Sequence, residues 1–180
     1  MHTMRNVLVP TDFSPASLEL VEKTAQALAG ESLHIVLFHA FDIPFFVSDI
    51  VRSPALPYQD LLTEPFRQAC CAVKHLFPKT IRSIAVRHLH GNSNAVFRNF
   101  ADANDIDLIV YPEYYVFQPV HTGSVNPHGM FMKAGIPLLR TFLPRKRVEA
   151  GEAMMHTDNL KTELYAVKEE HTLQVHFREN

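Results

Sequence analysis

Short apolar runs alternate along the chain with segments in which apolar residues recur at helical spacing. Val7, Leu8 and Val9 form the first run, and residues 33–41 form the second. Runs with so few polar positions are typical of strands that are buried on both faces of a parallel sheet. Residues 18–28 lie between them and place their apolar side chains on one face of a helix. We therefore expect a strand, a helix that packs on the sheet, and a second strand parallel to the first.

The same alternation continues through most of the chain. Residues 81–89 alternate apolar and polar positions, as in a strand with one wetter face, which places this strand at a sheet edge. The remaining expected elements are helices near 66–77, 96–103 and 130–134, and strands at 107–111 and 136–142. Because strands and helices alternate, right-handed crossovers predict an α/β fold with a doubly wound, five-stranded parallel sheet.

The loop after the first strand has the polar side chains of a candidate site. Pro10 ends the strand, Ser14 fits the N-cap of the helix, and Pro15 fits its first turn, where a missing N–H costs nothing. Thr11 and Asp12 lie between the strand and this cap. Open α/β sheets bind their ligands at the carboxyl ends of central strands, so this loop should contribute to any site.

Length and charge limit the classes of function. A chain of 180 residues with a net charge of -2 is long enough for one domain, at residues 1–144, with a C-terminal extension at 145–180. The small negative charge argues against nucleic acid as a partner. The first residues lack the pattern of a secretory signal, and no apolar run predicts a membrane span. Cys70 and Cys71 are adjacent and cannot join distant segments, so we expect buried thiols and a cytoplasmic location.

Two segments stand apart from the alternating pattern. Residues 42–57 contain three prolines and no clear period, which predicts a long loop. In the C-terminal extension, the spacing predicts a helix around 160–167 and a strand around 173–177. A lone strand needs a partner for its backbone groups, so this one should add to the sheet of its own or of a second subunit.

Three stretches of the chain resemble universal stress proteins. They are the run VLVPTDFSPAS that begins at Val7, the strand LHIVLFHAF that begins at Leu33, and the run DLIV at 107–110, which follows a glycine and a helix as in that family. The resemblance implies an adenine nucleotide alpha hydrolase-like fold with strand order 3-2-1-4-5, to which this chain adds a C-terminal helix and strand. It also implies a stress-linked regulatory role and a homodimer formed through the last strand, between Ile136 and Phe142. We expect the C-terminal extension, which lies beyond the resemblance, to take part in the homodimer as well.

Members of that family that bind ATP hold its phosphates with a Gly-x-x-Gly, nine residues, Gly-Ser/Thr pattern after the fourth strand. Aligned on that strand, this chain has Pro112 at the first glycine and Tyr115 at the second, while Gly123 and Ser124 match the final pair. Proline has no N–H to donate, and tyrosine adds a ring where only hydrogen leaves room for a phosphate. We therefore predict that the family's ATP-binding mode is lost or strongly weakened.

The crevice expected between the first and fourth strands is a candidate ligand site lined by Thr11, Asp12, Pro112, Tyr115, Gly123 and Ser124. Asp12 either accepts a ribose hydroxyl or makes an Asx turn within its own loop. Gly123 and Ser124 either meet a phosphate or form a turn and a helix cap, and we favour the second. No cofactor is predicted, and ATP is the one candidate that the resemblance raises.

His39, His88 and His90 lie near the ends of neighbouring expected strands, where three imidazoles together would suit zinc or iron. No carboxylate or cysteine is placed to join them, and the chain has 11 histidines, so we attribute the grouping to chance and predict no metal site. No catalytic motif is present either. We expect a non-catalytic regulatory or binding module. The alternatives are an ATP-binding or weakly ATP-hydrolysing universal stress protein with a remodelled phosphate loop, and a histidine-based metal-dependent protein.

Overall fold

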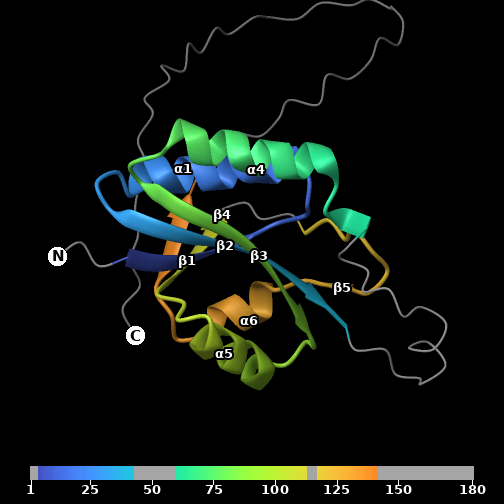
Figure 1. The fold of residues 1–180 in the computed structure, drawn as a ribbon. Coiled ribbons are helices and arrows are strands. Elements are labelled where there is room, and N and C mark those ends of the chain that lie inside the picture. Colours follow the sequence, from blue (N-terminus) through green and yellow to red (C-terminus); the bar gives the residue numbers. More distant parts are fainter. Residues whose placement is uncertain (1–3, 43–59, 113–116, 142–180) are drawn as a thin grey trace, which may run out of the picture.

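Residues 4–42, 60–112 and 117–141 are described by the structure, a computed structural model in which a twisted sheet lies between two layers of helices (Figure 1). The strands are β1 (Met4–Pro10), β2 (Ser32–Phe41), β3 (Ile81–His90), β4 (Leu108–Pro112), β5 (Ser124–Val125) and β6 (Leu138–Thr141). The helices are the 3-10 helix η1 (Pro15–Leu18) and the α-helices α1 (Glu19–Ala27), α4 (Glu64–Leu76), α5 (Asn94–Ala103) and α6 (His128–Met132).

The sheet has the strand order that the resemblance implied. Its order is β3-β2-β1-β4-β6, and neighbouring strands along this path are parallel. Since β6 is the fifth strand of the prediction, the order 3-2-1-4-5 and the adenine nucleotide alpha hydrolase-like fold are confirmed, with β3 at one edge. The sequence did not predict β5, which pairs antiparallel with the end of β2.

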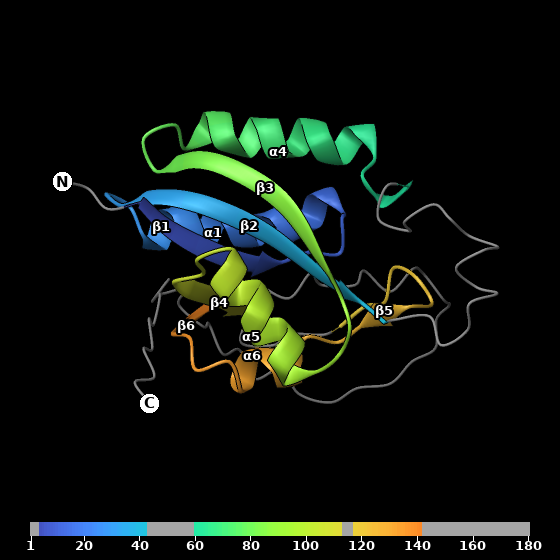
Figure 2. The ribbon, with the colours of Figure 1, turned by 60° about the horizontal axis from the view of Figure 1, so that its bottom comes forward.

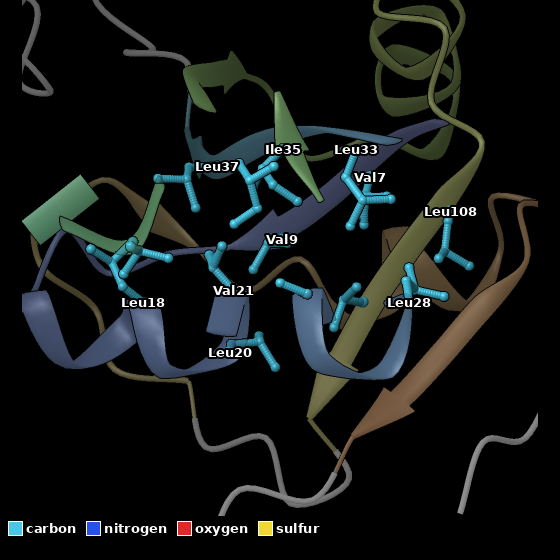
Figure 3. Close-up of a cluster of buried hydrophobic side chains, with 14 of the residues drawn as sticks. Val7, Val9, Leu18, Leu20, Val21, Leu28, Leu33, Ile35, Leu37 and Leu108 are labelled. Carbon is cyan, nitrogen blue, oxygen red and sulfur yellow. The ribbon is translucent and has the colours of Figure 1, made fainter. Parts of the chain in front are cut away.

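Each face of the sheet is covered by two helices, with α1 and α4 on one side and α5 and α6 on the other (Figure 2). Because side chains alternate along a strand, Val7 and Val9 of β1 point to the first face and Leu8 to the second, and none of the three is exposed to solvent. Figure 3 shows the first cluster, in which Val21 of α1 lies next to Val9 of β1. This burial on both faces confirms the prediction made from the unbroken apolar runs.

The helix that follows β1 begins where the sequence predicted. Ser14 is its N-cap and accepts a hydrogen bond from the N–H of Ser17, and Pro15 occupies the first position. The first turn is the 3-10 helix η1, which leads directly into α1. Phe13, just before the cap, has a φ of 59°, a conformation that costs energy for a residue with a bulky side chain. Its ring is buried, and this packing holds the turn in place.

Some expectations were wrong, and others lie outside the described residues. Gly123 and Ser124 do not cap a helix, because Ser124 begins β5 instead. Cys71 is exposed and Cys70 is half-buried, so the pair is not a pair of core thiols. The expected loop is described only at Asp42, and Phe142 with the whole C-terminal extension falls outside. Within the described ranges, no helix combines the length and the apolar character that a membrane span requires.

Candidate functional site

The loop after β1 is folded on itself by hydrogen bonds of its own side chains. Oδ1 of Asp12 accepts from the backbone N–H of Ser14 at 2.9 Å and from its hydroxyl at 2.6 Å. Oγ1 of Thr11 accepts from the N–H of Phe13 at 3.0 Å. These bonds make the Asx turn that was one of the two alternatives for Asp12. Asp12 accepts both hydrogen bonds through Oδ1, so Oδ2 takes no part in the turn.

His39 connects this loop to β5. Its ring lies near the end of β2, is 4% exposed, and forms a hydrogen bond through each nitrogen. Nδ1 is 2.7 Å from the carbonyl oxygen of Thr11, and Nε2 is 3.0 Å from the hydroxyl oxygen of Ser124. The structure therefore joins Thr11 and Ser124, which the sequence placed in one crevice, to His39, which was considered apart from them as a metal ligand. It gives His39 a role other than metal binding.

The backbone around Gly123 and Ser124 is bonded within its own turn. The N–H of Gly123 donates to Nδ1 of His121 at 3.0 Å, and the N–H of Ser124 donates to the carbonyl of His121 at 2.9 Å. The hydroxyl oxygen of Ser124 accepts from the N–H of His121 at 3.1 Å. The carbonyl of Gly123 accepts from the N–H of Asp42 at 2.7 Å. The groups that would face a phosphate in this turn are thus already occupied.

Sequence reasoning missed His121, the residue on which this turn depends. A histidine two residues before a glycine in a loop can accept from the glycine N–H, but that spacing does not by itself predict the bond. The ring is exposed, and the chain offers 11 histidines, so nothing in the local pattern marked this one.

Pro112 is buried at the end of β4, in register with Thr141 of β6. It supplies no N–H at this position, as the sequence implies. Thr141 is buried as well, and its hydroxyl has no hydrogen-bond partner among the described residues. Tyr115, aligned with the second glycine of the family pattern, lies outside the described residues.

A polar contact joins the end of β4 to α6. The hydroxyl of Tyr111 lies 2.5 Å from Nδ1 of His128 on α6, and its ring packs edge-on against Phe131. Burial raises the pKa of Tyr111 above its ordinary value of 10.0, although Arg140 opposes the shift. Tyr111 therefore stays neutral near physiological pH and joins β4 to α6.

Imidazole rings gather around Phe41. Its ring centroid lies 4.8 Å from that of His39, 6.0 Å from His90, 6.2 Å from His121 and 6.5 Å from His88. Phe41 thus lies among the three histidines that were considered as metal ligands, and both nitrogens of His39 are already bonded. Among residues 4–42, 60–112 and 117–141, no group of three or more His, Cys, Asp or Glu side chains is placed to hold a metal ion.

Burial disfavours the charged form of two of these rings, His39 and His88. It lowers the pKa of His39 below its ordinary value of 6.5, more than the bond to Thr11 and the charge of Asp12 raise it. Burial also lowers the pKa of His88, with smaller contributions from His90 and Arg87. The imidazoles of His39 and His88 are therefore neutral at physiological pH, and these two rings offer no standing positive charge to a phosphate.

The strand order and the loop after β1 define the class of protein as an adenine nucleotide alpha hydrolase-like α/β protein. The sequence profile described as "Universal stress protein family" matches residues 3–112, which is more than half of the chain. The chain belongs to the universal stress protein family.

Solved structures that are similar to this chain have low sequence identity to it. A hypothetical protein named PH0823 is 18% identical with a TM-score of 0.48, and the match covers 76% of this chain and 94% of that one. A universal stress protein in complex with cAMP is 20% identical with a TM-score of 0.41, over 77% and 96%. The universal stress protein UspA from Lactobacillus plantarum is 15% identical with a TM-score of 0.38, over 76% and 96%. No curated protein matches the chain.

Proposed function

We propose that this chain is a non-catalytic regulatory or binding module of the universal stress protein family that no longer holds ATP phosphates in the family's way. The observation that carries the proposal is the closed turn at residues 121–124. The N–H groups of Gly123 and Ser124 both donate to His121, and the hydroxyl of Ser124 is bonded to His39.

A triphosphate held by backbone needs N–H groups that point into the site and have no other partner. In this turn, a phosphate would have to displace the bonds between Gly123, Ser124 and His121. Pro112 cannot donate a hydrogen bond to the phosphate to compensate, because its nitrogen carries no hydrogen. The loss of the bonds inside the turn opposes the gain of bonds to phosphate, which supports a weakened ATP mode.

Calorimetric titration with Mg-ATP tests this proposal. We expect no binding heat at millimolar nucleotide near pH 7.5, where His39 is neutral, and no release of inorganic phosphate. The same titration of Asp12→Ala is the matched control. Micromolar binding by the unaltered chain that disappears in Asp12→Ala would contradict the proposal.

The second candidate function is ATP binding or slow ATP hydrolysis through a remodelled phosphate loop. The geometry of Asp12 favours it, since the Asx turn uses Oδ1 and leaves Oδ2 for a ribose hydroxyl. This candidate requires the turn at residues 121–124 to open when nucleotide binds. It therefore predicts that His121→Ala, which removes the acceptor for the Gly123 N–H, binds Mg-ATP more tightly than the unaltered chain does.

We also propose a cytoplasmic homodimer that forms through residues 136–142 and the C-terminal extension. The position of β6 at the edge of the sheet supports the first part, because an edge strand has backbone groups that a second subunit can pair. The free thiols of Cys70 and Cys71 suit a reducing compartment. Light scattering after size exclusion should give twice the chain mass of 20.5 kDa, and a monomer mass would contradict the proposal.

A further inference from the structure

β3 forms one edge of the sheet, and among the described residues it pairs with β2 alone. The N–H of Gly91 donates to the carbonyl of Phe41, so the backbone groups of Gly91 point toward β2. Because these groups alternate in direction along a strand, those of Ala85 point toward β2 as well. The N–H and C=O groups of Ile84 and Val86 therefore point away from the sheet.

These outward groups have few partners. The carbonyl of Val86 accepts from the guanidinium of Arg87 at 3.3 Å, and both groups are exposed. Within the part of the chain that the structure describes, the N–H of Val86 and the two backbone groups of Ile84 have no hydrogen bond. An edge of this kind is a template for a further strand.

The two faces of this edge differ in polarity. Ile84 and Val86 are half-buried and pack against the apolar cluster on the side of α4, which lies along β3 (Figure 2). On the opposite face, Arg87 is exposed and Ser83 bonds to His34. A strand added here would therefore need apolar side chains toward α4 and polar side chains on the other face.

Of the segments outside the described residues, residues 172–178 have the matching pattern. They read TLQVHFR, in which Leu173, Val175 and Phe177 alternate with polar positions. Residues 43–59 lack this period and contain three prolines, which have no N–H for a sheet. The sequence therefore favours residues 172–178 as the occupant of this edge.

Charge favours the same segment over a second copy of β3. Arg82 and Arg87 are exposed, and neither forms an ion pair with any described residue. Two copies of β3 would place four arginines along one strand pair, with no acidic residue of β3 among them. Residues 172–178 instead have Glu170 shortly before them and Glu179 directly after them.

The chain is long enough to make this connection. β6 ends at Thr141, on the opposite edge of the sheet from β3. A strand beyond β3 would lie five strand spacings from β6, or about 24 Å. Residues 142–171 span roughly 100 Å when fully extended, so they can cross the sheet even if part of them is helical.

We propose that residues 172–178 pair with the outer edge of β3 in the same chain. Leu173, Val175 and Phe177 then lie on the α4 side and extend the apolar face of the sheet, while their backbone supplies partners for β3. The pairing leaves residues 142–171 to the proposed homodimer, and it does not depend on whether the chain binds a nucleotide.

Amide hydrogen exchange of the full chain, followed by NMR, tests this pairing. We expect the amides of Ile84, Ala85 and Val86 to be protected without a break. An open edge instead gives an alternating pattern, in which Ala85 is protected through β2 while Ile84 and Val86 exchange near their intrinsic rates. That alternation in the unaltered chain would overturn the proposal.

The deciding variant carries both Gln174→Pro and Val175→Pro. Successive N–H groups of a strand point to opposite sides, so this pair of prolines removes one N–H that faces β3 in any register. The protection of Ile84 and Val86 should fall about tenfold or more, while Leu8 in β1 keeps its protection. Undiminished protection of Ile84 and Val86 would mean that another segment or a second β3 covers the edge, and would overturn the proposal.

The matched control carries Ala153→Pro and Met154→Pro, within the extension but outside the segment, and should keep the protection of the unaltered chain. A loss there would overturn the assignment to residues 172–178. Isotope-labelled deciding variant, unfolded and refolded together with excess unlabelled unaltered chain, separates the same chain from a second copy. We expect no recovery of protection in the labelled chain, and recovery would overturn pairing within one chain.

Discussion

Phe38 and His39 are neighbours on β2, yet they belong to two very different sides of the sheet. Phe38 packs in an aromatic cluster with Phe97, Phe100 and Phe131, at centroid distances of 5.5, 5.0 and 5.7 Å. His39 instead connects two loops through hydrogen bonds. One strand therefore stabilises the fold on one face and organises the candidate site on the other. The comparison teaches that the site depends on a few directed bonds, whereas the fold depends on buried apolar area.

Substitutions in the aromatic cluster around Phe38 should cost more stability than substitutions on the face of His39. Phe97 is 0% exposed, and Phe97→Ala should lower the free energy of unfolding by about 3–5 kcal/mol, because it leaves a cavity among three rings. Val96, next to it on α5, is 36% exposed, and Val96→Ala should cost about 0.5 kcal/mol or less. Urea unfolding followed by circular dichroism measures both. Equal losses would mean that the cluster around Phe38 is not tightly packed.

The next largest losses of stability are expected from the serine N-caps of the two faces. Ser93 caps α5 on the aromatic side, and Ser14 caps the helix after β1 on the histidine side. Ser93→Ala should cost about 1 kcal/mol, as expected for the loss of an N-cap. Ser14→Ala should cost more, up to about 2 kcal/mol, because it also removes the hydroxyl bond to Asp12. The same unfolding experiment applies, and the reverse order would show that Asp12 does not depend on Ser14.

Acidification should lower the free energy of unfolding through His39 and His88, and by less than the substitutions above. Burial lowers the folded-state pKa of His39 and His88 below the ordinary 6.5, so between the two values the unfolded chain binds protons that the folded chain does not. Their contribution to stability is therefore complete above about pH 6.5 and is lost as the pH falls toward the folded-state values. Unfolding free energies measured across this range should show the decline. His39→Gln should flatten it, whereas His75→Gln, at an exposed position of α4, should not.

The smallest effect concerns the thiols of α4, which covers the same face as His39. Burial, helped by the neighbouring Cys71, raises the pKa of Cys70 to about 11, so its thiol forms little thiolate at neutral pH. Cys71 is exposed. A thiol reagent should therefore modify Cys71 first, and Cys71→Ser should remove the fast phase while Cys70→Ser keeps it. Stability should be unchanged in Cys71→Ser, and a fast phase that survives there would contradict the assignment.

The fold was largely predictable from the sequence, because each part of it leaves a local pattern. The unbroken run at Val7, Leu8 and Val9 reports burial on both faces, and alternation at residues 81–89 reports an edge strand. Ser14 and Pro15 mark a helix start through rules that act within one turn. The strand order itself came from resemblance to the universal stress protein family.

The candidate site was predicted only in part, because its bonds join residues that are far apart in the chain. His39 and Ser124 are 85 residues apart, and β5 is too short to have a period of its own. The Asx turn of Asp12 was foreseen as one of two alternatives because it needs only the next few residues. No local sequence pattern predicted the role of His121. Its turn occupies the N–H groups of Gly123 and Ser124, which the family pattern would have placed against a phosphate.

The central claim is that the N–H groups of Gly123 and Ser124 are bonded within the chain and do not serve phosphates. Amide exchange of these two residues near pH 7.5, with and without millimolar Mg-ATP, tests it most directly. We predict that both amides are protected without nucleotide and that their protection does not change when Mg-ATP is added. Amides that exchange freely without nucleotide and become protected in its presence would contradict the account.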